Sequence, residues 1–121
     1  MSMAFIRERA ARLIELISKF TSFRACASLY GVRVSLVERR TNELLTLLSA
    51  IGVNVRAPQL RECHVCDAKA EAEFMKTVSA VLRVADSLKD ELMLAGAGEG
   101  IKDVVAGIDR IVVEVRRAKQ S

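Results

Sequence analysis

The residues best suited to chemistry are three cysteines and one histidine, and three of these four lie in the run Cys63-His64-Val65-Cys66. Two thiolates at C-x-x-C spacing can bind one side of a tetrahedral zinc ion, but a closed site needs four ligands. A metal site would therefore require Cys26 as well, together with His64, carboxylates or a second subunit. Cys63, His64 and Cys66 are thus a weak metal candidate, and we expect neither a metal nor another cofactor.

Redox chemistry is the second use of this run. It precedes a predicted helix, whose N-terminal dipole lowers a thiol pKa, as redox C-x-x-C sites require. The βαβ context of thioredoxin-like enzymes is absent from the sequence, so the pattern does not favour redox catalysis. We expect free thiols, with Cys26 buried on the first helix. A disulfide is the alternative if the source is a hyperthermophile, which the scarcity of Asn and Gln weakly favours.

A glycine-rich break at residues 96–100 is the remaining pattern that could bind a ligand, since such loops before helices can hold phosphate. It matches neither the dinucleotide fingerprint nor the P-loop, it follows a helix, and its Glu99 would repel an anion. We interpret it as a helix stop. Because no serine or cysteine lies near a second catalytic partner in the sequence, we predict that the protein is not an enzyme.

Basic charge is concentrated in one part of the chain. The net charge is +4, and residues 24–61 contain six arginines but only two acidic residues. Arginine binds phosphate in a bidentate manner and also serves protein interfaces. A helical partner at i+4 is evident only for Arg39, which precedes Glu43. The candidate residues for binding nucleic acid or another anionic partner are Arg24, Arg33, Arg39, Arg40, Arg56 and Arg61.

The elements that carry these residues are predicted to be helices. Of the 121 residues, 51% are hydrophobic and only 4% aromatic, which indicates one folded domain, residues 1–121, with an aliphatic core. Apolar residues recurring every three or four positions predict helices at about 3–29, 35–51, 67–95 and 101–118. We expect an all-α fold, an antiparallel four-helix bundle. Residues 53–66 lack this period and predict a short β-hairpin or an irregular connector.

Capping residues indicate where two of these helices begin. Ser35 and Glu38 have the spacing of a capping box, in which each side chain bonds the other residue's amide. Asp67 can cap the third predicted helix.

Two functions follow from this sequence. Excess apolar positions on the second, third and fourth predicted helices favour a non-enzymatic assembly subunit that self-associates or joins a larger complex. The alternative is an accessory nucleic-acid-binding protein whose arginines contact the phosphate backbone without sequence preference. We infer no small-molecule substrate. No apolar run suits a membrane span, and charges at Arg7, Glu8, Arg9 and Arg12 exclude a signal peptide, so we expect a cytoplasmic protein without a membrane partner.

Overall fold

The computed structural model describes residues 3–96 and 98–120, so the predicted single domain extends beyond it at residues 1, 2, 97 and 121. The described part contains helices and no strand, which confirms the all-α prediction. Its elements are α1 (Met3–Ser22), α2 (Arg24–Leu29), α3 (Val34–Ala50), α4 (Ala68–Ala95), α5 (Glu99–Val115) and the 3₁₀ turn η1 (Arg116–Lys119). Within these residues no helix combines the length and apolar character that crossing a membrane requires.

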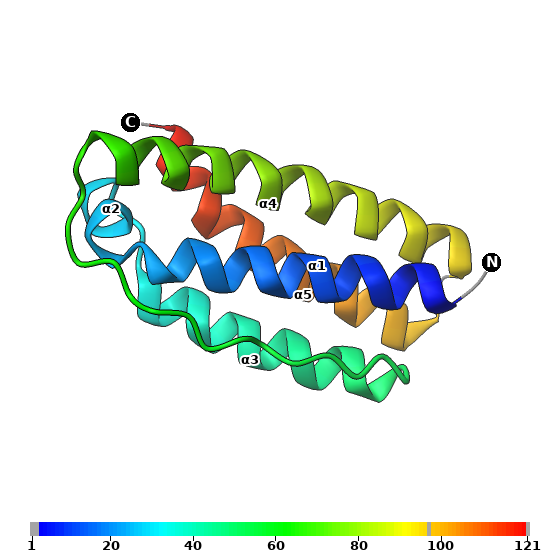
Figure 1. Cartoon of the computed structure of the whole chain (residues 1–121). Helices are drawn as coiled ribbons and strands as arrows, with labels where there is room; N and C mark the ends of the chain where they lie inside the picture. Colours follow the sequence, from blue (N-terminus) through cyan, green and yellow to red (C-terminus); the bar gives the residue numbers. More distant parts are fainter. Residues whose placement is uncertain (1–2, 97, 121) are drawn as a thin grey trace.

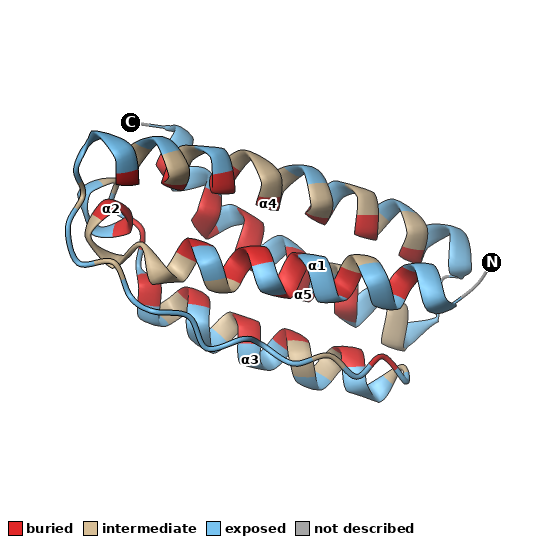
Figure 2. Ribbon diagram, viewed as in Figure 1, coloured by how far each residue is buried: buried red, intermediate tan, exposed pale blue. Residues whose placement is uncertain are grey.

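The four long helices lie side by side in a bundle-like arrangement (Figure 1). α1 packs mainly against α4, α3 packs mainly against α5, and α4 also contacts α5. Buried residues recur along each long helix between exposed ones (Figure 2), as the apolar period of the sequence requires. The buried hydrophobic residues are aliphatic apart from Cys26 and the fully buried phenylalanines Phe20 and Phe74.

The first predicted helix, residues 3–29, is wrong as a single element. α1 ends at Ser22, and Phe23 has φ −85° and ψ 62°, outside the helical region. This break allows aromatic rings from both sides of it to surround Phe74. The ring centroids of Phe20, Phe23 and Tyr30 lie 5.2, 6.1 and 5.9 Å from that of Phe74. Packing of these rings, each such pair worth about 0.5–1.5 kcal/mol, offsets the interrupted helix.

The two capping predictions have different outcomes. The Asp67 carboxylate accepts a hydrogen bond from the Ala70 amide at 2.8 Å, which confirms it as the N-cap of α4. The Ser35 capping box is wrong, because α3 begins one residue earlier, at the buried Val34, with Arg33 as its N-cap. The Arg33 amide donates instead to the Glu114 carboxylate of α5 at 3.0 Å. A carboxylate from another helix therefore supplies the negative charge that a helix N-terminus favours.

A long connector joins α3 to α4. Residues 53–67 form neither helix nor strand, so the irregular alternative is confirmed and no β-hairpin forms there. The connector runs back along α3 to the start of α4 (Figure 1), and most of it is exposed (Figure 2). Val53 is buried near its start, and the Cys63 amide donates to the Ser22 carbonyl at 2.7 Å near its end. The buried Val53 and the hydrogen bond from Cys63 to Ser22 fix the two ends of the connector on the bundle.

The boundaries of the last two helices differ slightly from the prediction. α4 ends at Ala95, before Gly96, whose φ of 149° is a conformation that glycine favours. The predicted helix stop is therefore confirmed, although Ala97 within that glycine-rich break lies outside the described residues. α5 ends at Val115 and continues as η1, which buries Ala118.

Candidate functional site

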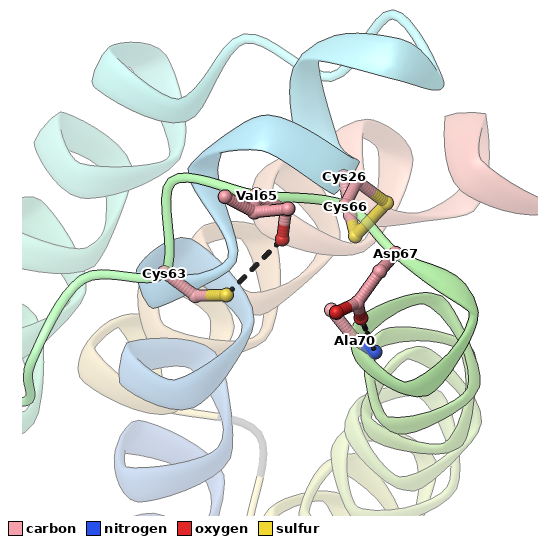
Figure 3. Close-up of a disulfide and its surroundings, with 6 residues drawn as sticks. All are labelled: Cys26, Cys63, Val65, Cys66, Asp67 and Ala70. Carbon is pink, nitrogen blue, oxygen red and sulfur yellow. Dashed lines mark hydrogen bonds between the residues drawn. A yellow bond between two sulfur atoms is a disulfide. The ribbon is translucent and has the colours of Figure 1, made fainter.

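Cys26 and Cys66 form a disulfide that joins α2 to the end of the connector (Figure 3). Their Cα atoms are 5.0 Å apart, although 40 residues separate them in the sequence. The expectation of free thiols is therefore wrong for these two residues and holds for Cys63. The break at Phe23 is the physical reason, because it ends α1 and starts a separate helix that carries Cys26 to the connector.

The connector segment around Cys63 is held in place by several contacts. The Cys63 thiol donates a hydrogen bond to the carbonyl of Val65, two residues later, at 3.2 Å (Figure 3). His64 is mostly exposed, and its Nε2 lies 3.5 Å from Glu62 Oε2. No group of three or more Cys, His, Asp or Glu in the described part of the chain is arranged to hold a metal ion.

Arg24, at the start of α2, forms hydrogen bonds to both α3 and the connector. Its Nε donates to Glu62 Oε1 at 2.7 Å, and its Nη2 donates to Glu38 Oε2 at 3.2 Å. The hydrogen bond from Arg24 lowers the pKa of Glu62 below its ordinary value. Arg24 therefore ties α2 to both α3 and the connector, and its charge is already matched by two carboxylates.

Arg33 has a structural partner as well. Its Nε and Nη2 donate to the two carboxylate oxygens of Glu114 at 3.3 and 3.2 Å, and Arg117 Nε donates to the same carboxylate at 3.2 Å. Burial raises the pKa of Glu114, but the hydrogen bonds from Arg33 and the charge of Arg117 outweigh it, so the pKa falls below its ordinary value. A buried carboxylate thus stays ionised because two arginines surround it.

The six candidate arginines do not come together as one site. Arg40 pairs with Glu43 at 3.0 Å, whereas the sequence predicts the pair Arg39–Glu43. Arg39, Arg56 and Arg61 are exposed and form no ion pair within residues 3–96 and 98–120. The predicted cluster is therefore divided between two helices and the connector.

Two arginines outside the predicted set join part of it. Arg117 shares Glu114 with Arg33, and Arg110 lies on the same face of α5, since positions 110, 114 and 117 follow the helical spacing. On α3, Arg40 follows Arg33 at the same interval of seven residues. We name Arg33, Arg40, Arg110 and Arg117 the α3/α5 arginine row. The repeated interval of seven was the sequence signal that could have revealed it.

α3 and α5 approach each other closely beneath this row. A side chain at Gly107 would place its Cβ 3.1 Å from Leu47 Cδ1 and 3.3 Å from Leu44 Cδ1. The small residue therefore allows the two helices to pack with little space between their backbones, which brings their edges together.

A polar groove of about 570 Å³ lies between α1, α3 and the connector. Three hydroxyls that line it, those of Thr21, Ser22 and Thr41, donate to carbonyls of their own helices. Its remaining polar lining includes Ser18, Asn42 and Gln59. The groove thus lies under an exposed connector, and these three hydroxyls are engaged within their helices.

Apolar side chains are exposed at the end of the molecule where α1 begins and α4 ends. We name Met3, Phe5, Met93 and Leu94 the apolar end; each is more than 40% exposed. The hydrogen bond from Arg9 Nε to Ser87 Oγ, 2.9 Å, aligns α1 with α4 there. Beside it, a pocket of about 310 Å³ between α4 and α5 is lined by Met93, Gly96, Ile101, Lys102, Val105, Ala106 and Asp109.

Comparison with known proteins identifies no relative, because no family model, no curated protein and no solved structure matches the chain.

Proposed function

We propose that this chain is a non-enzymatic assembly subunit that associates with a second copy of itself through the apolar end. The observation that supports this is the exposure of four large apolar side chains at one end of the molecule: Met3 41%, Phe5 53%, Met93 68% and Leu94 72%. Exposed apolar side chains that gather in one place mark interaction sites more often than scattered ones do.

The pocket beside the apolar end favours a second copy as the partner. Phe5 is an exposed aromatic ring, and Met93, Ile101 and Val105 line a pocket large enough to receive such a ring. In a two-fold dimer each subunit offers the same surface, so Phe5 of each copy can enter the pocket of the other. An aromatic side chain seated in a pocket is the usual energetic centre of an interface.

The scaffold that we propose for this surface is an antiparallel four-helix bundle made by α1, α3, α4 and α5. The pairs Arg9–Ser87 and Lys19–Glu73 support it, because the residue number rises along α1 while it falls along α4. The pair Lys89–Asp109, at 2.8 Å, is consistent with the same relation between α4 and α5. Packed helices of this kind present their end residues in fixed positions.

The test measures molar mass by light scattering behind size exclusion at micromolar concentrations. Wild type is expected to give twice the chain mass, and the double variant Phe5→Ser/Met93→Ser is expected to give the mass of one chain. The matched control is Val113→Ser, which removes an equally exposed apolar side chain from α5 and should leave the dimer intact. A monomeric wild type, or a dimer that survives the double variant, contradicts the proposal.

A second candidate function is sequence-independent binding of nucleic acid, and the α3/α5 arginine row is the observation that favours it. Arg110 makes no ion pair within the described residues, and Arg40 bonds only the neighbouring Glu43. Guanidinium groups on two adjacent helix edges suit contacts with successive phosphates of one strand.

Fluorescence polarisation of a labelled single-stranded oligonucleotide at low and moderate salt tests this second function. Binding should weaken steeply as salt rises, since each phosphate contact releases counterions. Arg40→Gln/Arg110→Gln should weaken binding at low salt, whereas Arg83→Gln on the exposed side of α4 should not. Absence of binding by wild type at low salt contradicts the function.

A further inference from the structure

We propose that the polar groove between α1, α3 and the connector binds a short aliphatic polyamine, a chain of methylene groups with an ammonium group at each end. The groove has a volume of about 570 Å³ and shares no lining residue with the apolar end, so the site does not depend on the proposed function. The character of its lining points to this class of ligand.

The charged residues that line the groove are both acidic. They are Glu38 of α3 and Glu62 of the connector, and none of the described lysines, arginines or His64 is among the lining residues. The two carboxylates share one guanidinium, that of Arg24, so these three side chains carry one negative charge in excess. Each glutamate side chain is more than 40% exposed, which leaves room for a ligand to reach it. A cation is therefore favoured in this groove, although the whole chain carries a net charge of +4.

Three hydroxyls in the groove are available to a ligand only as acceptors. Thr21, Ser22 and Thr41 donate to carbonyls of their own helices at 3.1, 2.6 and 2.7 Å. A hydroxyl has one hydrogen to donate and two lone pairs, so each of these oxygens can still accept a hydrogen bond. A ligand that binds here has to supply the donors, and an ammonium group has donors and no acceptor.

The groove has a carboxylate end and an amide end. Ser22 lies at the carboxylate end, because its carbonyl accepts the amide of Cys63 in the connector. Ser18 comes one turn earlier on α1, and Asn42 comes one turn after Glu38 on α3. Since α1 runs toward α2 and α3 runs away from it (Figure 1), both residues lie at the other end. One helical turn is about 5.4 Å, a distance that a short methylene chain spans.

Apolar groups complete the lining. Ile17 of α1 and Ala57, Pro58 and Leu60 of the connector line the groove together with the polar residues. Methylene groups that pack against these side chains are removed from water. The side-chain carbonyl of Gln59 adds an acceptor from the connector. An aliphatic chain between two ammonium groups thus matches both the apolar and the polar part of the lining, whereas an anion would face two carboxylates.

Isothermal titration calorimetry of the full-length oxidised chain with spermidine, at low salt, tests the site. One molecule per chain is expected, with an affinity that falls as salt rises. Triethylene glycol, an uncharged chain, should not bind. Nα-acetyl-lysine amide, which has a single ammonium group, should bind at least about tenfold more weakly than spermidine. Wild type that does not bind spermidine, or that binds triethylene glycol equally well, overturns the site. Equal affinity for the lysine derivative overturns the assignment of two ends.

Glu38→Gln should weaken spermidine binding at least about tenfold, since it removes one charged acceptor but can still accept from Arg24. The matched control is Glu43→Gln on the same helix. Its side chain is 44% exposed, against 45% for Glu38, and it also pairs with an arginine but does not line the groove. Both variants change the net charge equally, so equal affinities in the two would overturn the location of the site.

Gln59→Lys tests the same location without altering an ion pair. The new ammonium group lies on the exposed connector, where it should leave the melting temperature unchanged and compete with the ligand for the groove. Spermidine binding should therefore weaken, and Glu43→Gln again controls for the change in net charge. Wild-type affinity in Gln59→Lys contradicts the site even if Glu38→Gln fails to fold.

Discussion

Glu114 of α5 accepts hydrogen bonds from both the backbone amide and the guanidinium of Arg33, at 3.0 Å and at 3.2–3.3 Å. One buried carboxylate therefore caps the N-terminus of α3 and binds the side chain of its N-cap residue. This contact joins residues that are 81 positions apart in the sequence.

The lowered pKa of Glu114 predicts a loss of stability in acid. The ionised form is favoured in the folded chain, so this contribution is fully present above the unfolded pKa of about 4.5 and is lost as pH falls through the lower folded value. Urea unfolding followed from pH 7 to pH 3 should show this decline in wild type. Glu114→Gln should be less stable at pH 7, by about 1–3 kcal/mol, and should show a shallower decline. Equal pH dependence in the two proteins contradicts the prediction.

Replacing the two capping residues that the sequence suggests, Asp67 and Ser35, with alanine should lower the free energy of unfolding by different amounts. Asp67→Ala should lower the free energy of unfolding by about 1 kcal/mol, because the Ala70 amide loses its acceptor. Ser35→Ala should change it by less than about 0.5 kcal/mol, since Ser35 is exposed and lies inside α3. Chemical denaturation of both variants measures the difference. A larger cost for Ser35→Ala would show that the capping box forms after all.

The disulfide predicts a stability that depends on the redox state. A cross-link that closes a loop of this length stabilises by about 3–4 kcal/mol through the entropy of the unfolded chain. Wild type should lose this amount when reduced, and Cys26→Ala/Cys66→Ala should resemble the reduced form under all conditions. Denaturation with and without reductant, with Cys63→Ser as the control that still responds to reductant, makes the comparison. Wild type that is insensitive to reductant contradicts it.

The close approach of α3 and α5 predicts that Gly107 tolerates no large side chain. Leu44 and Leu47 lie within 3.3 Å of the position that a Cβ would take. Gly107→Leu should destabilise by about 1–3 kcal/mol through overpacking. Val113→Leu, at an exposed position of the same helix, should be nearly neutral. Thermal unfolding of both variants tests this, and a Gly107→Leu protein as stable as wild type would contradict the close packing.

Local patterns in the sequence were enough for the helical class, for most helix boundaries and for the Asp67 cap. They were insufficient wherever a distant residue decides the outcome. The break at Phe23 depends on Phe74, the start of α3 depends on Glu114, and the oxidation of Cys26 depends on Cys66. In the first two cases helix propensity or capping chemistry near the residue is overridden by a tertiary contact, and in the third the bonding partner is 40 residues away in the sequence.

The six candidate arginines do not form one site because their positions also depend on contacts between distant residues. A charge count along the sequence cannot tell that Arg24 and Arg33 pair with carboxylates, or that Arg40 and not Arg39 pairs with Glu43 on α3. The repeated interval of seven indicates two arginine pairs in the sequence, but only the packing of α3 on α5 brings the two pairs together as the α3/α5 arginine row. The apolar end likewise depends on α1 beginning where α4 ends.

The exposed connector has a consequence for proteolysis. Arg56 and Arg61 present trypsin with exposed peptide bonds between α3 and α4. A nick after either residue would leave α1 to α3 in one fragment and α4 and α5 in the other, with each fragment holding the main packing partners of the other. The Cys26–Cys66 bond would still span the cut, so the nicked protein would migrate as one chain until it is reduced.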